Sequence, residues 1–282
     1  MTAVILATAC AVVYGTADFF GGLATRRSPV LAVVVLSQLA GLALIAGMLP
    51  LLPGLASGPA LLWGLAAGLA GAGGLVLFYR ALATGVMSVV APVAAVTSAA
   101  LPVLWGLAKG ERPQALAMAG VVLALGSVLL VSQDRSPARR GGSRGSVLMA
   151  LTAGAGFGGF FVLLDLAPDD SGLWPLMGAR LSSVAAVALV ALATRRALRP
   201  GSGAWRVIAA AGVLDMLANV LYLLAQRQGL VSLVAVLVAL YPASTLLLAR
   251  QVLGERLRPI QVTGVTCALA AVSLIAFASS GA

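Results

Sequence analysis

GVMSVVAPVAAVTSAALPVLWGLAKGER, residues 85–112, is the stretch that decides the fold, because a similar stretch follows 144 positions later. The second stretch, residues 229–256, is GLVSLVAVLVALYPASTLLLARQVLGER. The two align without a gap, share small residues such as Ala95 and Ala239, and end on the same triplet, Gly-Glu-Arg. Similarity at a fixed spacing indicates that a structural unit has been duplicated.

The composition around the repeat is that of a membrane protein. Of the 282 residues, 61% are hydrophobic and only 9% are charged, whereas soluble domains carry about 25% charged residues. Apolar runs of about 20 residues are long enough to cross the hydrocarbon core as helices, which satisfy their own backbone hydrogen bonds. We therefore predict an all-α polytopic membrane protein with ten membrane-spanning helices. The predicted helices cover roughly residues 3–24, 30–51, 60–81, 85–107, 114–131, 146–166, 173–194, 206–226, 229–251 and 258–278.

The longest polar stretch divides these helices into five and five. Residues 132–145, SQDRSPARRGGSRG, have the composition of a flexible basic linker between repeats at 1–131 and 146–282. Tyr14-Gly15 aligns with Phe157-Gly158 at a spacing of 143, so the whole five-helix unit is duplicated. Because five is odd, the second unit must cross the membrane in the opposite sense. The prediction is two inverted five-helix repeats, an organisation typical of secondary transporters.

The basic residues predict an orientation. Fourteen of the 18 Lys and Arg residues lie in or beside the loops after odd-numbered predicted helices, including the linker. The loops after even-numbered helices hold Lys109, Arg112 and Arg227, and Arg180 lies inside a span. The positive-inside rule then places the linker in the cytoplasm and both termini outside. The same distribution explains the net charge of +10 without nucleic-acid binding.

The eighth predicted helix carries a polar stripe. Asp215, Asn219, Tyr222 and Gln226 follow one another at i, i+4, i+7 and i+11, which places them on one helix face. A charged residue near the middle of a span is costly and needs a partner or a function. The stripe is thus a candidate for binding a substrate or a proton. The alternative is a structural hydrogen-bond network with neighbouring helices.

Other spans add candidate site residues. Tyr14 and Asp18 share a face of the first helix, where Asp18 either lines a cavity or pairs with a basic group near the surface. Burial disfavours the charged form of a carboxyl group, so Asp18 or Asp215 could take and release a proton. Arg180 is expected either to neutralise an anionic substrate or Asp215, or to reach the nearer surface. Its counterpart in the first repeat lies near Gln38.

Prolines mark the fourth helix of each repeat. Pro92 and Pro102 lie in the first copy, and Pro242 follows Tyr241 in the second. Each removes a backbone hydrogen bond and can kink the helix, which would shape the cavity or provide a bending point. Proline is also tolerated in membrane helices without such a role.

The loops carry further expectations. In each Gly-Glu-Arg triplet, the glycine is expected to end one helix. The glutamates, Glu111 and Glu255, would favour the positive end of the helix that follows. Asp165, Asp169 and Asp170 come at or after the end of the sixth helix and are expected to be solvated.

Together these features resemble the drug/metabolite transporter superfamily, EamA type. The resemblance rests on the ten spans, the two five-helix copies, the aromatic-Gly pairs, YRAL at residues 79–82 and the two Gly-Glu-Arg triplets. It implies export or uptake of small organic solutes through a cavity between the halves. It also implies cytoplasmic termini, the reverse of the orientation that the loop charges predict.

We expect a transporter rather than an enzyme. The chain has no histidine and no nucleotide-binding loop, and Cys10 and Cys267 form no metal or redox motif, so no cofactor or metal is expected. The prediction is a secondary transporter of the cytoplasmic membrane that moves a small organic metabolite or drug by alternating access. It would be proton-coupled or exchange-driven, and monomeric or homodimeric. The alternatives are an intramembrane enzyme using Asp18 with Asp215, and a lipid carrier whose cavity opens laterally.

Overall fold

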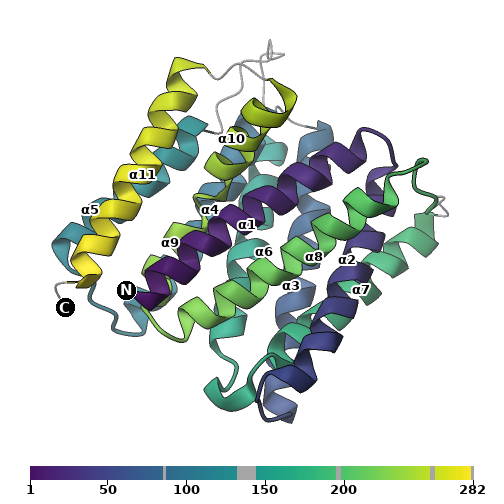
Figure 1. The fold of residues 1–282 in the computed structure, drawn as a ribbon, viewed down its shortest axis with the longest axis horizontal. Coiled ribbons are helices and arrows are strands. Elements are labelled where there is room, and N and C mark those ends of the chain that lie inside the picture. Colours follow the sequence, from purple (N-terminus) through teal and green to yellow (C-terminus); the bar gives the residue numbers. More distant parts are fainter. Residues whose placement is uncertain (85–86, 132–143, 195–197, 255–257, 281–282) are drawn as a thin grey trace.

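The structure is a computed structural model, which describes residues 1–84, 87–131, 144–194, 198–254 and 258–280. Every regular element within them is a helix (Figure 1). The α-helices are α1 (Thr2–Thr25), α2 (Val30–Met48), α3 (Gly58–Thr84), α4 (Met87–Ala108), α5 (Ala115–Val131), α6 (Arg144–Asp165), α7 (Trp174–Thr194), α8 (Trp205–Gln226), α9 (Val231–Val238), α10 (Tyr241–Leu253) and α11 (Pro259–Ser280). Short 3₁₀ turns occupy Leu49–Leu51 and Asp169–Ser171.

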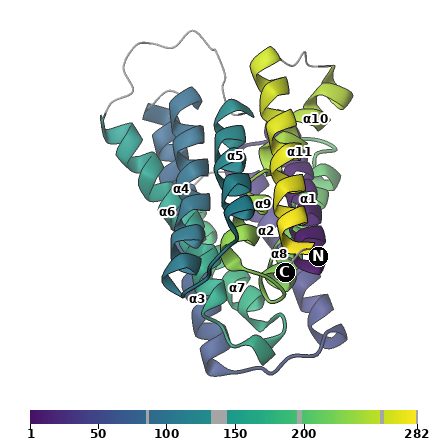
Figure 2. The same ribbon diagram turned by 90° about the vertical axis from the view of Figure 1, so that its left-hand side faces the viewer.

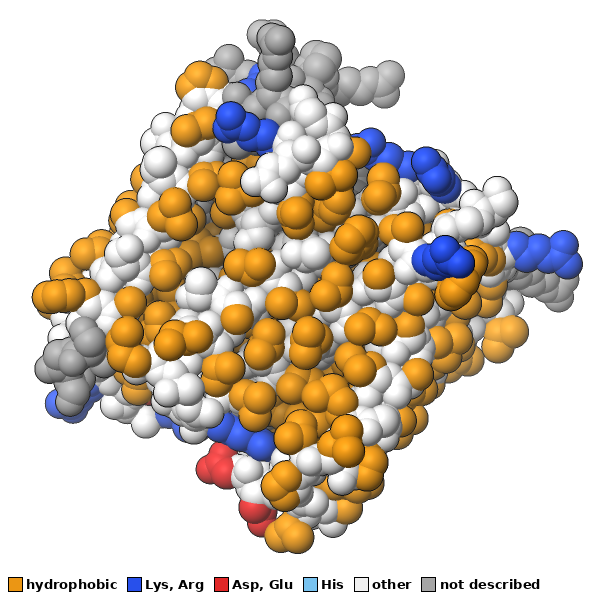
Figure 3. All heavy atoms as spheres, in the orientation of Figure 1, with side chains coloured by type: hydrophobic (Ala, Val, Ile, Leu, Met, Phe, Trp, Pro, Cys, Tyr) orange, Lys and Arg blue, Asp and Glu red, His pale blue; other side chains and the backbone are white. Residues whose placement is uncertain are grey.

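The all-helical membrane class is confirmed, whereas the count of ten spans stays a prediction. Within the described ranges, eight segments are long and apolar enough to cross a membrane, with α9 and α10 together forming one of them. Two shorter apolar stretches, Val93–Ala108 and α5, fall below the 18-residue length. Large apolar side chains such as Leu192 and Phe277 are 75% and 73% exposed. Figure 3 shows hydrophobic side chains across the broad face, with Lys and Arg towards its edges, as a lipid-embedded protein requires.

The helix ends gather on two opposite faces. We call the face where α5 ends and α6 begins the linker face, and the face where α1 begins and α11 ends the terminus face (Figures 1 and 2). Loops meet at both: Gly201 N donates to Ser28 Oγ at 2.9 Å on the linker face. On the terminus face, Leu55 N donates to the carbonyl oxygen of Asp170, also at 2.9 Å.

Helix packing follows the same pattern in both halves of the chain. α1 packs on α8 and α10, and α6 packs correspondingly on α3 and α4. α2 contacts α8, just as α7 contacts α3. Equivalent helices also meet each other, in the pairs α2 with α7, α4 with α9, and α5 with α11, the last of which Figure 2 shows side by side.

The aromatic-Gly pairs have a packing role in both halves. A Cβ atom at Gly15 would lie 2.5 Å from the carbonyl oxygen of Tyr241 in α10. A Cβ atom at Gly158 would lie 2.9 Å from the carbonyl oxygen of Ser98 in α4. Only glycine therefore permits these close approaches of α1 to α10 and of α6 to α4.

The fourth helices of the two halves differ. The predicted ninth helix is broken, because α9 ends at Val238 and α10 begins at Tyr241. Pro242 lies in the first turn of α10, where the lack of an N–H group removes no hydrogen bond. By contrast, α4 runs as one helix through Pro92 and Pro102. The prolines thus do not have the same effect in the two copies.

Candidate functional site

A cavity of about 690 Å³ lies between the two halves. This volume is within the range of sites for small organic ligands, about 300–1,000 Å³. Its walls come from α1 to α10, so both halves contribute. Of the nine residues predicted to bind or couple, seven line it: Tyr14, Asp18, Gln38, Arg180, Asp215, Asn219 and Tyr241. Their functional roles stay predictions.

An ion pair joins three helices at the cavity wall. Arg180 in α7 donates from Nη2 to Asp215 Oδ2 in α8 at 2.7 Å. Its Nη1 donates to Oε1 of Gln38 in α2, which also accepts from Ser183 Oγ at 3.0 Å. Arg180 is only 7% exposed, so its charge is compensated inside the protein rather than at a surface. The structure thus places Arg180 as a counter-charge to Asp215.

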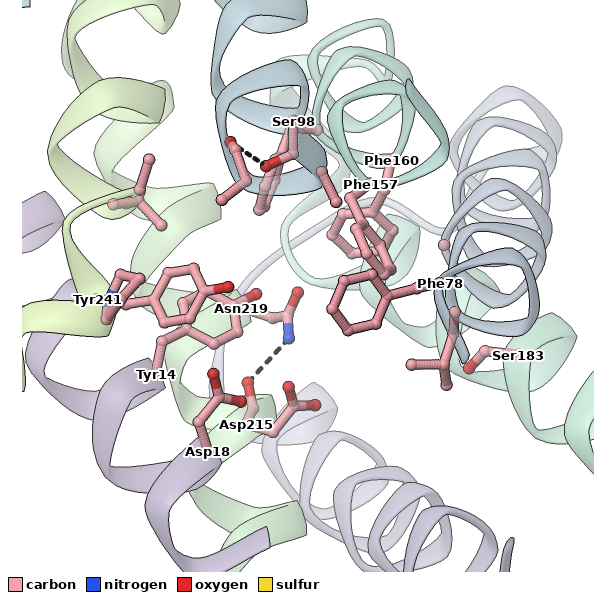
Figure 4. A pocket seen from close by; sticks show the side chains of 18 of the residues that line it. Tyr14, Asp18, Phe78, Ser98, Phe157, Phe160, Ser183, Asp215, Asn219 and Tyr241 are labelled. Atoms are coloured by element: carbon pink, nitrogen blue, oxygen red, sulfur yellow. Dashed lines mark hydrogen bonds between the residues drawn. The ribbon is translucent and has the colours of Figure 1, made fainter. Parts of the chain in front are cut away.

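Asp18 differs from Asp215 in having no such partner. It is an exposed residue of α1 that lines the cavity, and Figure 4 shows its carboxyl group beside Asp215. Among the described residues, none forms an ion pair or hydrogen bond with Asp18. Tyr14, one turn earlier, faces Tyr241 of α10 with 6.2 Å between ring centroids. An acidic group and two tyrosines therefore share this part of the wall.

The polar stripe of α8 enters the cavity only in part. Asn219 donates from Nδ2 to the backbone oxygen of Asp215 at 2.8 Å and lies at the middle of the cavity (Figure 4). Tyr222 and Gln226 do not line the cavity. They are buried further along α8, and Tyr222 Oη and Gln226 Oε1 have no hydrogen-bond partner in the described part of the chain. The stripe therefore leads from the cavity towards the terminus face.

The wall opposite the acids is aromatic. Phe157 and Phe160 of α6 and Phe78 of α3 lie across the cavity from Asp18 and Asp215 (Figure 4). The rings of Phe78 and Phe157 pack edge to face with 6.0 Å between centroids. These phenylalanines, together with Phe161, were not predicted as site residues. A lipid-facing and a cavity-facing phenylalanine look alike in sequence, and only their alignment with Tyr14 and Asp18 gives a signal.

Positions that correspond between the repeats line the cavity together. The spacing is 143 in the first helix, 142 in the second, and 144 from the third onwards. Among the described residues, nine such pairs have both members in the wall: Tyr14/Phe157, Asp18/Phe161, Gln38/Arg180, Gly71/Asp215, Ala72/Met216, Leu75/Asn219, Ala94/Val238, Ala95/Ala239 and Ser98/Pro242. The duplicated framework therefore builds both walls, whereas their chemistry differs.

The predicted bending points are placed unequally. Pro242 lines the cavity at the break between α9 and α10. Pro102 is buried in α4 and does not line it. The side chain of Pro92 lies outside the described residues. A role of these prolines in gating stays a prediction.

The cavity reaches towards one face and is blocked from the other. Val131 at the end of α5 and Ala249 in α10 extend its lining towards the linker face. On the terminus side lies the largest cluster of buried apolar side chains, which includes Tyr222 and Leu237, each at most 1% exposed. In this conformation a solute would thus approach from the linker face.

Glu111 closes the terminus face in a way that the sequence did not predict. Its carboxylate accepts from the backbone N–H of Val231 at 2.7 Å and of Ser232 at 3.1 Å, and from Ser232 Oγ at 2.6 Å. It therefore caps α9 of the other half, not α5, the helix that follows it. Gly110 and Gly254 have φ of 92° and 68°, as expected for glycines after helix ends. Glu255 lies outside the described residues.

Asp165 is also not solvated as expected. Its Oδ2 accepts from Lys109 Nζ and from Trp105 Nε1, both at 2.8 Å, and its side chain is 10% exposed. These contacts tie the end of α4 to the end of α6 on the terminus face. Asp169 and Asp170 are exposed, as predicted.

Comparison with known proteins agrees with this architecture. Residues 144–277 match the model of the EamA-like transporter family. The whole fold is similar to a solved structure titled "Crystal structure of protein", with a TM-score of 0.79 and 18% identity, over 98% of this chain and 97% of that chain. No curated protein matches the sequence significantly. The family match and the apolar helices confirm the EamA-type resemblance and an integral multi-pass membrane protein.

Proposed function

We propose that this chain, an EamA-type member of the drug/metabolite transporters, is a secondary transporter that moves a small organic solute across the cytoplasmic membrane by alternating access. Its units would be two inverted five-helix repeats, at residues 1–131 and 146–282, joined by the linker at 132–145. The observation that carries the proposal is the solute-sized cavity that both halves build and that is blocked on the terminus face.

The helix packing supports the inverted repeat. Exchanging each helix of the first half for its counterpart in the second half leaves the most extensive pairings unchanged, with α9 and α10 together corresponding to α4. Equivalent helices pack on each other in three pairs, as expected near an axis that relates two similar units. Two such units can rock around a shared site and open it to either side in turn.

The contacts on the terminus face supply a closed gate for one state. Glu111 holds the start of α9, and the group of Asp165, Lys109 and Trp105 joins α4 to α6. In the opposite state these contacts would separate. Tyr222 and Gln226, which continue the polar stripe beyond the cavity, would then line the passage. Their unpaired buried oxygens are costly in the closed state and would be hydrated in the open one.

The carboxyl groups of the cavity are the candidates for coupling. Asp215 is held by Arg180, whereas Asp18 has no protein partner among the described residues. Transport would therefore be coupled to a proton at these acids or driven by exchange of solutes. Equal transport with and without a pH gradient, together with an unchanged rate in Asp215→Asn, would exclude proton coupling and leave exchange.

The test of transport is solute flux in proteoliposomes containing the purified chain. Amino acids, nucleosides, polyamines and cationic drugs are first screened by thermal shift, and each hit is offered as a radiolabelled solute. Saturable uptake that Asp215→Asn reduces, and that Asp169→Asn, an exposed acid away from the cavity, leaves unchanged, is the expected result. Chemical conversion of the solute without flux would point to an enzyme. Movement of fluorescent lipid between leaflets would point to a lipid carrier.

The loop charges predict that the linker face, and with it the open side of the cavity, lies in the cytoplasm. A single cysteine in the linker tests this orientation when the protein is expressed in intact cells. Protection from a membrane-impermeant thiol reagent is expected. Labelling would reverse the orientation to the one that the family resemblance implies, with the cavity open to the outside.

A further inference from the structure

We infer that the solute is an amphipathic organic cation, with its ammonium group at Asp18 and its apolar body against the phenylalanines of α6. The inference deepens the proposed transport function and rests on it, because only a transporter would carry the bound ligand as a solute. The binding claim itself requires only the cavity.

The charges of the cavity carry the first step. Among the described residues, its lining contains three charged side chains: Asp18, Arg180 and Asp215. Arg180 is already bonded to Asp215 and Gln38, so one positive and one negative charge neutralise each other. One carboxyl group, that of Asp18, is left without a partner in the described part of the chain. A cation would complete the charge balance, because charges inside a membrane protein are normally paired.

An anionic solute fits this arrangement poorly. To reach Arg180 it would have to displace Asp215 from a 2.7 Å ion pair. It would then lie beside the carboxyl group of Asp18, and the two negative charges would repel each other. Arg180 is also largely buried within the wall, at 7% exposure, whereas Asp18 is exposed.

The shape of the cavity carries the second step. A volume of about 690 Å³ exceeds what an inorganic ion needs and suits an organic molecule. Tyr14 and Tyr241 lie next to Asp18, and aromatic faces attract ammonium groups within about 6 Å. Across the cavity, Phe157 and Phe161 occupy the positions that correspond to Tyr14 and Asp18, and they offer apolar surface for the rest of the molecule.

Three ligands with the same body and different head groups test the charge requirement: 2-phenylethylamine, 2-phenylethanol and 3-phenylpropanoate. Tryptamine and 1-aminoadamantane extend the amine set to larger bodies. Binding to the purified full chain in nanodiscs is measured by calorimetry at one pH. At least one amine is expected to bind, with the alcohol weaker and the carboxylate undetectable. Asp18→Asn is expected to raise the Kd of that amine by about tenfold or more.

Variants separate a charge effect from misfolding. Asp18→Glu keeps the charge and should retain binding, and Asp169→Asn should bind like the wild type. All three variants, Asp18→Asn included, must elute as monodisperse protein. Without ligand, each must also have a melting temperature close to that of the wild type. Binding of the carboxylate as tightly as the amines, an unchanged Kd in a folded Asp18→Asn, or no binding by any of the three amines would overturn the inference. Flux of an anionic solute in proteoliposomes would overturn the inference while leaving the proposed transport intact. Amine binding without flux would support the inference and contradict the proposed transport.

Discussion

The two walls of the cavity occupy corresponding positions of two similar halves, yet one is polar and the other apolar. α1 and α8 present Asp18, Asp215 and Asn219. Their counterparts α6 and α3 present Phe161, Gly71 and Leu75 at the corresponding positions. The residues that pack the helices together are alike in the two halves. Gly15 and Gly158, for example, make similar close contacts with a facing helix.

This difference teaches that backbone and lining follow separate requirements. The proposed alternating access needs two halves that pack in the same way, so that the closed and open arrangements have similar free energies. Recognition of an asymmetric solute needs two walls that differ. Framework positions should therefore respond alike to substitution in both halves, whereas lining positions should respond differently.

The largest effect is expected from breaking the polar wall. Asp215→Asn leaves the guanidinium of Arg180 buried with only Gln38 as a side-chain oxygen partner. Losing one partner of a buried pair costs about 3–5 kcal/mol. We expect about 2–3 kcal/mol, because the Asp215 side chain is 39% exposed. The loss of melting temperature and of transport checks this prediction.

The apolar wall supplies the matched control for that substitution. Gly71→Ala, at the corresponding position of α3, should be close to neutral, because the new Cβ would meet Phe160 no closer than 3.4 Å. Adding Arg180→Gln to Asp215→Asn should recover part of the stability. Additive losses in the double variant would show that the two side chains are not energetically coupled.

The framework prediction concerns Gly15 and Gly158. Replacing either by Ala places a Cβ within 3.0 Å of backbone or Cβ atoms of the facing helix. Such overpacking costs about 1–3 kcal/mol. Both variants should lose thermal stability, Gly15→Ala somewhat more because its nearest contact is a carbonyl oxygen at 2.5 Å. If only one of the two variants kept the wild-type thermal stability, the two halves would not be equivalent in their packing.

The third prediction concerns the difference between the two faces. Glu111→Ala removes the cap of α9, and caps contribute about 1 kcal/mol. The terminus face should open more often, by roughly fivefold in population for that free energy. In a chain lacking Cys10 and Cys267, Gln226→Cys should then react faster with a thiol reagent. Ala249→Cys on the linker face should react more slowly, and a rise at both positions would indicate unfolding instead.

The smallest effect is expected at Tyr222. Tyr222→Phe removes a buried hydroxyl that has no partner among the described residues, while keeping the contact with Phe161 at 4.2 Å between ring centroids. Removing an unsatisfied polar group is neutral or stabilising, by about 1 kcal/mol. The melting temperature should hold or rise slightly, whereas transport should slow if the hydroxyl lines the passage in the opposite state. A clear loss of stability would mean that Tyr222 is hydrogen-bonded in the membrane.

The fold was largely predictable because its signals are local. Apolar runs and short polar loops mark helix ends, and the described helices begin and end within a few residues of the predicted positions. The break before Tyr241 was missed, since a proline at a helix start and a proline inside a kinked helix give the same sequence. Hydrogen bonding at Ala239 and Leu240, not composition, decides between them.

The sequence predicted which face of α8 carries the site, but not how far along that face the cavity extends. The spacing of Asp215, Asn219, Tyr222 and Gln226 gives a shared helix face, but it does not say where along that face the cavity ends. The partners of Glu111 and Asp165 were also out of reach. Each contact joins residues more than 50 positions apart, and local spacing carries no information about such pairs.

The packing of α1 has a consequence for the order in which the protein is made. α1 leaves the ribosome first, yet its main partners, α8 and α10, are synthesised some 200 residues later. During that interval the face of α1 that carries Gly15 lacks the helices that pack against it. Completion of the C-terminal half would therefore be the committing step of biogenesis, and ribosome pausing near the linker would prolong exposure of the first half to membrane proteases.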